Sequence, residues 1–171
     1  MNIETPASGI SNDAASELKV IDCDVHPALA GGLSALFPLM PSPWVERFKL
    51  KGGHLAVAAP LGFRFEHPVG SAARHDARTP DGGPPGSDPD YMRRDLLDAH
   101  GISVAVLTSL QAGQFGTVSS GPDESAVIVS AFNDHFLDVW PLSDEKRLRL
   151  AMTVTTQDPR AGAAEIRRVG S

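Results

Sequence analysis

The order of its segments limits what this chain can fold into more than any other feature of the sequence. Residues 19–26, 102–108 and 148–155 have strand character, and each run is followed by a stretch with helical periodicity. The run at 102–108 (ISVAVLT) is almost continuously apolar, which is typical of a parallel strand buried on both faces. Repeated strand–helix order predicts an α/β fold, with about three parallel strands joined by right-handed crossovers.

Helix boundaries are marked by residues that cap helices or stop them. A short helix is expected after Ser42, with Pro43 in its first turn, and the last predicted helix opens at Asp158 and runs to about residue 169. Between them, the periodicity predicts helices over 91–100, capped by Asp90 and ended by Gly101, and over 122–140, ended by Pro141. The expected apolar face of helix 91–100 consists of Met92, Leu96 and Ala99.

Two segments do not fit the strand–helix pattern. Residues 1–18 are polar and aperiodic, which predicts a flexible tail in front of one domain over 19–171. Residues 67–90 contain five Pro and four Gly and few apolar side chains. They are therefore expected to form an irregular, exposed loop.

Charge and composition exclude several kinds of partner. The 171 residues carry a formal net charge of −6, which argues against binding to nucleic acid or to an anionic membrane. No apolar stretch is long enough to span a membrane, and the N-terminal residues do not resemble a signal peptide. The single cysteine, Cys23, excludes an intrachain disulfide, so a soluble, cytoplasmic protein is expected. No glycine-rich phosphate-binding motif is present.

The first predicted strand carries the residues most suited to chemistry. Alternation places Asp22, Asp24 and His26 on one face, and Ile21, Cys23 and Val25 on a face that is expected to pack on helices. In a parallel sheet, ligands bind at the carboxyl ends of the strands. An aspartate and a histidine close together there predict a site for a divalent cation, because burying either group alone is costly. An exposed edge strand, or hydrogen bonds that close the next loop, would explain the same pattern without a metal.

Residues 20–27 (VIDCDVHP) resemble the first strand of the amidohydrolase-related family, which includes the aminocarboxymuconate-semialdehyde decarboxylase group. That strand reads roughly I-D-x-H-x-H in the family, and its last two alternating residues bind the metal. The resemblance assigns these two positions to Asp24 and His26, with Asp24 at a position that is more often histidine. It implies a divalent metal ion, and the mixed nitrogen and oxygen ligands favour zinc or manganese.

Three further segments are similar to the same family, in the same order. They are residues 95–107, residues 131–134 (AFND) followed by Trp140, and residues 148–166. The resemblance spans about residues 20–169 and implies the N-terminal part of a (β/α)₈ TIM barrel, incomplete with three of eight strands. It also implies a metal-dependent hydrolase or non-oxidative decarboxylase acting on a small carboxylated or aromatic molecule.

The catalytic residues cannot be named from this sequence, because the family's remaining ligands and its catalytic aspartate follow later strands. An alternative is therefore a non-catalytic, truncated fragment that needs the missing C-terminal part or a partner chain. The expected protein partner is a complementary chain or a second copy in a homo-oligomer. On a barrel, Thr108, Gln111 and Gln157 would face the mouth of the active site, and Arg64 could bind a substrate carboxylate. These four are the candidate substrate-binding residues.

Overall fold

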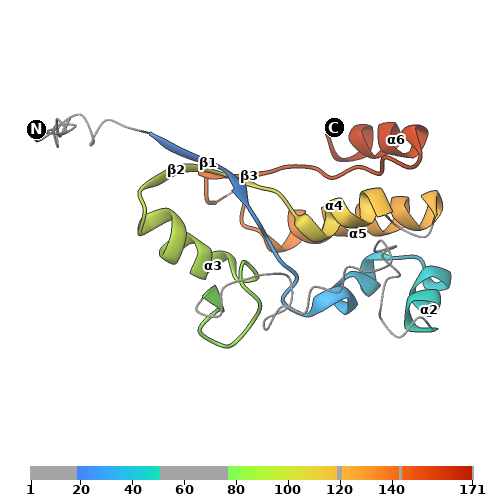
Figure 1. Cartoon of the computed structure of the whole chain (residues 1–171), viewed down its shortest axis with the longest axis horizontal. Helices are drawn as coiled ribbons and strands as arrows, with labels where there is room; N and C mark the ends of the chain where they lie inside the picture. Colours follow the sequence, from blue (N-terminus) through green and yellow to red (C-terminus); the bar gives the residue numbers. More distant parts are fainter. Residues whose placement is uncertain (1–18, 51–76, 119–120, 143, 171) are drawn as a thin grey trace, which may run out of the picture.

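A computed structural model describes residues 19–50, 77–118, 121–142 and 144–170 (Figure 1). The predicted tail at 1–18 and the candidate residue Arg64 lie outside these ranges. The elements follow the chain in the order β1 (Val20–Val25), η1 (Gly32–Leu39), α2 (Ser42–Leu50), α3 (Pro89–Met92), η3 (Arg93–Asp98), β2 (Ile102–Leu107), α4 (Leu110–Val118), α5 (Pro122–Val139), β3 (Leu148–Leu150) and α6 (Pro159–Val169).

The three strands form one parallel sheet in the order β1-β2-β3, which confirms the predicted α/β class. A sheet of three parallel strands is common to a barrel segment and to an open doubly wound sheet. The third strand is three residues long, much shorter than the predicted 148–155. Beyond it, the backbone of Thr153 leaves the sheet and bonds to the side chain of Asn133 on α5.

The alternation predicted for β1 is interrupted. Between Asp22 and Val25 the register shifts, so that three steps along β1 match two along β2. Residues paired side by side share a face of the sheet, so the shift places Ile21 on the face opposite Val25. Val25 is buried, whereas Ile21 is 58% exposed and Cys23 is exposed. The prediction that Ile21 and Cys23 pack on helices is therefore wrong.

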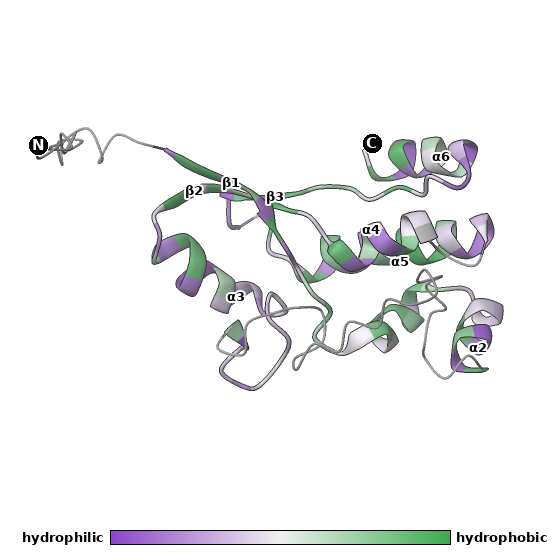
Figure 2. Cartoon of the chain, viewed as in Figure 1, coloured by the Kyte–Doolittle hydropathy of each residue, from purple (hydrophilic) through white to green (hydrophobic). Residues whose placement is uncertain are grey.

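The core lies between the sheet and the helices on one of its faces. Ala105 and Leu107 of β2 are fully buried, and Phe132 of α5 stacks on Phe115 of α4 with 5.7 Å between ring centroids. In Figure 1, α4 and α5 lie side by side, and α5 also contacts η1 and α6. Figure 2 shows apolar residues along β1 and β2. None of the helices in the described residues is long and apolar enough to cross a membrane.

The helix predicted over 91–100 forms with a different start, and its buried face matches the prediction in part, because Met92 is buried and Leu96 packs against the core. Its N-cap is Asp88, whose carboxylate accepts a hydrogen bond from the Tyr91 N–H, and the turn after α3 is π-helical. A π-helical turn holds an extra residue, which rotates the buried face. Leu97 is accordingly fully buried and Ala99 is exposed. The predicted glycine after the helix is confirmed, since Gly101 has a φ of +62°.

The proline- and glycine-rich loop is described from residue 77. It is irregular up to α3, as predicted, but Thr79 and Ser87 are buried, so full exposure was a wrong expectation. Local hydrogen bonds make this part compact. The Asp81 carboxylate accepts from the Thr79 hydroxyl and the Gly83 N–H, and these contacts lower the pKa of Asp81.

Candidate metal centre

The candidate centre lies where β1 and β2 end side by side. Val25 pairs with Leu107, and the Thr108 N–H extends this pairing by donating to the Val25 carbonyl at 2.7 Å. His26 and Thr108 are therefore neighbours at the carboxyl edge of the sheet. This is the edge at which parallel α/β sheets bind ligands.

The ring of His26 is oriented by the backbone of Thr108. Its Nδ1 lies 2.8 Å from the Thr108 carbonyl oxygen, and because a carbonyl can only accept, Nδ1 carries the proton. The neutral ring then has its lone pair on Nε2. That nitrogen lies 3.6 Å from Oδ1 of Asp24, with the two side chains 37% and 82% exposed. The prediction that Asp24 and His26 lie on the same side, within several ångströms of each other, is confirmed.

The Thr108 hydroxyl lies between the two candidate ligands. Its Oγ1 is 3.4 Å from Oδ1 of Asp24, to which it donates, and 3.3 Å from Nδ1 of His26. Thr108 was expected to contact substrate. That stays a prediction; in the structure Thr108 contacts the two candidate ligands, through both its carbonyl and its hydroxyl.

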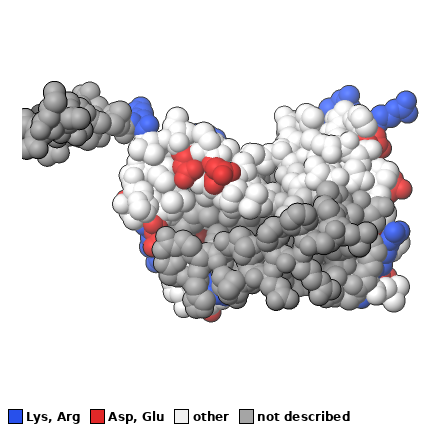
Figure 3. All heavy atoms as spheres, viewed as in Figure 1, with Lys and Arg blue, Asp and Glu red and all other residues white. Residues whose placement is uncertain are grey.

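Asp22, the third ionisable residue of the strand, does not join this pair. Its Oδ1 accepts a hydrogen bond from the Asp24 N–H at 3.1 Å. Asp22 also lies on the far side of the register shift from His26. Figure 3 shows acidic side chains gathered over the region of the sheet.

The distance between Nε2 and Oδ1 suits a shared cation. Zinc bonds of about 2.0–2.1 Å to nitrogen and 2.0–2.2 Å to oxygen, at a tetrahedral angle, separate the two ligand atoms by roughly 3.4 Å. The observed 3.6 Å needs only a small side-chain adjustment. Within the described residues, no group of three or more His, Cys, Asp or Glu side chains is arranged to hold a metal ion. Asp24 and His26 thus have the spacing of two ligands of one divalent cation.

Gln111 lies in the first turn of α4, a helix that the sequence analysis missed. Two glycines and a threonine give residues 110–118 poor helix propensity, but Ser109 caps the helix by accepting from the Ala112 N–H at 3.2 Å. The Gln111 Oε1 atom is buried and has no hydrogen-bond partner among the described residues. No hydrogen bond or ion pair of the described residues joins Gln111 to Asp24 or His26.

Gln157 lies after β3, in the segment that leads to α6. The neighbouring Thr156 donates its N–H to the Gly116 carbonyl, near the end of α4. Gly116 lies six residues into α4, which is roughly 9 Å along the helix from its start beside Thr108. The expectation that Gln157 binds substrate stays a prediction.

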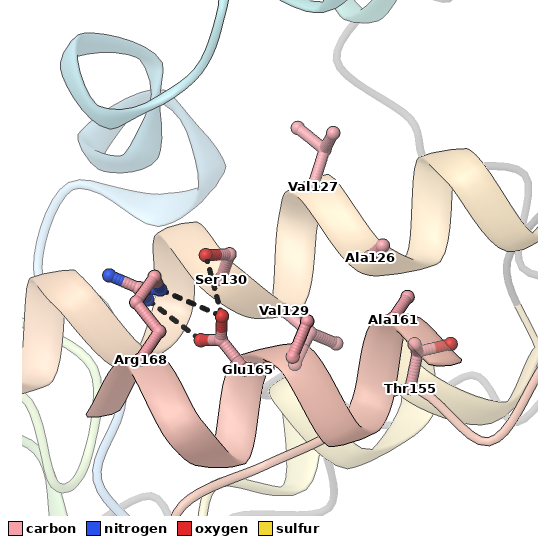
Figure 4. A pocket seen from close by; sticks show the side chains of 9 residues that line it. Ala126, Val127, Val129, Ser130, Thr155, Ala161, Glu165 and Arg168 are labelled. Atoms are coloured by element: carbon pink, nitrogen blue, oxygen red, sulfur yellow. Dashed lines mark hydrogen bonds and ion pairs between the residues drawn. The ribbon is translucent and has the colours of Figure 1, made fainter. Parts of the chain in front are cut away.

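A separate hollow of about 300 Å³ lies between α5 and α6 (Figure 4). Its walls are mainly apolar, with Ser130, Glu165 and Arg168 at one end. Burial acts to raise the pKa of Glu165, but hydrogen bonds from Arg168, Asn133 and Ser130 outweigh it and the pKa is lowered. The carboxylate is thus held ionised as part of the packing of the two helices.

Comparison with known proteins does not assign a family. No protein-family model matches the chain, and no curated protein matches it significantly. The resemblance drawn from the sequence stays a prediction.

Proposed function

We propose that this chain carries part of the active site of a metal-dependent hydrolase or non-oxidative decarboxylase. The observation that supports it best is the orientation of His26. Its Nδ1–H donates to the Thr108 carbonyl at 2.8 Å. The lone pair of Nε2 is therefore available to a metal ion, and this nitrogen lies 3.6 Å from Oδ1 of Asp24. Metal-binding histidines are commonly oriented in this way by a backbone carbonyl.

Asp24 and His26 would hold a zinc or manganese ion between one carboxylate oxygen and one imidazole nitrogen. When bound, such a cation polarises a substrate or activates a water molecule. The carboxylate of Asp24 offsets part of the positive charge, and Thr108 holds the imidazole in the tautomer that can bind. By the resemblance of the sequence, the substrate is a small carboxylated or aromatic molecule. The single cysteine favours the cytoplasm as the compartment.

Two protein ligands are fewer than the three that a catalytic zinc site usually contains. The remaining ligands would come from later strands, as in the family that the sequence resembles, or from another chain. In the first case, the sheet is the N-terminal part of a (β/α)₈ barrel, and Asp24 and His26 lie at the mouth of its interior.

A second candidate is a non-catalytic fragment completed by a complementary chain or by a second copy of itself. The observation in its favour is the exposure of β1, where Val20 is 45% and Ile21 is 58% exposed. Within the described residues, β1 and β3 each pair only with β2, so both outer edges of the sheet have no strand partner. Unpaired edges of this kind favour association with another chain.

The deciding experiment is a calorimetric titration of the purified chain with Zn²⁺ and with Mn²⁺. His26→Gln and Asp24→Asn should each weaken binding tenfold or more, since each removes one of two ligands. His100→Gln is the matched control, because it makes the same change at an exposed histidine. Equal affinity for the wild type and His26→Gln would contradict the proposal.

Stoichiometry and product analysis separate the remaining alternatives. One metal per chain together with turnover of a small aromatic acid supports the enzyme, and release of CO₂ then distinguishes a decarboxylase from a hydrolase. One metal per two chains, with a dimer in sedimentation, supports completion of the site by a second copy.

A further inference from the structure

The backbone of His26 is in close contact with a glycine sixty residues away in the sequence. Gly86 accepts a hydrogen bond from the Ala28 N–H at 2.9 Å through its carbonyl oxygen. Its φ is +77°, in the left-handed region that favours glycine. A Cβ atom placed on Gly86 would overlap the His26 carbonyl oxygen and lie 3.7 Å from the Ala28 nitrogen. Only glycine lets this loop approach the end of β1 so closely.

Local hydrogen bonds hold the loop that carries Gly86. Ser87 is 8% exposed and donates its hydroxyl across Gly86 to the Pro84 carbonyl at 2.7 Å. The next residue, Asp88, caps α3 by accepting from the Tyr91 N–H at 2.9 Å. These contacts make the approach of Gly86 to His26 a built feature of the fold.

We propose that Gly86 is a positioning residue for the candidate ligand His26. This inference rests on the proposed function, because it concerns how the ligand of that site is held. The imidazole is anchored at its Nδ1 by the Thr108 carbonyl. The backbone that follows His26 is anchored by the hydrogen bond from the Ala28 N–H to Gly86. A side chain at position 86 would separate the two backbones by roughly 1 Å to restore a normal carbon–oxygen contact. A shift of that size at His26 exceeds what a 2.8 Å hydrogen bond tolerates.

The same loop offers a matched control. Gly82 also has a positive φ, +86°, but a Cβ there would meet nothing within 4 Å. Gly82→Ala therefore carries the same kind of backbone strain as Gly86→Ala without the overlap on His26. A difference between these two variants reports the contact with His26 and not the cost of alanine in the left-handed region.

The experiment compares the wild type, Gly86→Ala and Gly82→Ala by two measurements. The first is the ¹⁵N chemical shifts of the His26 ring in the metal-free protein, which report the tautomer and its hydrogen bond. The second is Zn²⁺ affinity by calorimetry. Gly86→Ala should change the His26 ring shifts and weaken Zn²⁺ binding tenfold or more, as loss of an orienting contact typically does. Gly82→Ala should leave both unchanged.

The outcomes separate this inference from the proposed function. Identical behaviour of the two glycine variants in both measurements overturns the role of Gly86. A change in the His26 ring shifts in Gly86→Ala supports that role even where His26→Gln shows that His26 does not bind zinc. If His26→Gln weakens zinc binding and Gly86→Ala does not, the positioning role is overturned and the ligand role stands.

The unmodified chain provides a test that does not depend on the variants folding. The Ala28 N–H, which donates to Gly86, should exchange with solvent much more slowly than in an unstructured peptide. Exchange at the unstructured rate would show that the contact does not hold the backbone, and would overturn the inference.

Discussion

Beyond β3, the side chain of Asn133 forms the kind of hydrogen bonds with the backbone that a neighbouring strand would form. Its Nδ2 donates to the Thr153 carbonyl at 2.8 Å and to Oε1 of Glu165 at 2.8 Å. Its Oδ1 accepts from the Thr153 N–H at 3.0 Å. Asn133 is only 3% exposed, so water cannot readily replace these partners. Substitution at this position should therefore loosen the contact between α5 and the segment that leads to α6.

The expected losses follow from the three hydrogen bonds. At about 1 kcal/mol each, Asn133→Ala should lower the free energy of unfolding by about 3 kcal/mol. Asn133→Asp keeps the shape of the side chain but removes both donated bonds and places a carboxylate beside Glu165. At pH 7, Asn133→Asp should therefore lower the free energy of unfolding by at least as much as Asn133→Ala. Burial and the neighbouring carboxylate raise the pKa of the new carboxyl group, so its protonation at lower pH should recover part of the loss.

Urea unfolding followed by circular dichroism, at pH 7 and at pH 5, measures both effects. Asp134→Asn is the control, because this neighbouring side chain is 36% exposed and ion-paired with Arg168 at 2.7 Å, an interaction worth less than about 1 kcal/mol at a surface. A loss below about 1 kcal/mol for Asn133→Ala would refute the reasoning. A deficit for Asn133→Asp that grows on acidification would refute the account of its charge.

Two other substitutions test the remaining contacts. Arg147→Met should lower the free energy of unfolding by about 1–2 kcal/mol at pH 7, because Arg147 donates to Glu145 and to Asp98. Hydrogen bonding by Arg147 lowers the pKa of Glu145 to about 2, so this stabilisation is complete above the ordinary pKa of 4.5 and is lost as the pH falls towards 2. The difference between Arg147→Met and the wild type in urea unfolding should therefore shrink at pH 3, and a constant difference would contradict the assignment. Thr108→Val should weaken Zn²⁺ binding up to about tenfold in calorimetry, because it removes the hydroxyl that donates to Asp24 but keeps the carbonyl that orients His26. Thr108→Ser should bind as the wild type does, and equal affinity for the valine variant would show that the hydroxyl has no part in the site.

Elements with strong local signals were predictable from the sequence. Helix α5 follows the predicted 122–140 closely, and α6 begins as expected at Asp158, whose carboxylate accepts from the N–H groups of Arg160 and Ala161. Helix α4 was missed because its stability comes from packing, with Ala112 and Phe115 buried against the core, and not from its propensity. The short β3 could not be predicted either, since it depends on a side chain of α5.

The candidate site shows the same division between local and distant causes. Alternation correctly placed Asp24 beside His26, because the two residues are only two positions apart and both come after Asp22, where the register shift begins. The same rule failed for Ile21, because the shift lies between it and Val25. The shift depends on how β1 pairs with β2, which starts 77 residues after Val25, and no pattern within β1 could reveal it. The contacts of His26 are just as distant, since the Thr108 carbonyl is 82 positions away. A local pattern can therefore identify the ligand pair, but the groups that orient it follow only from the pairing of the strands and the close approach of Gly86.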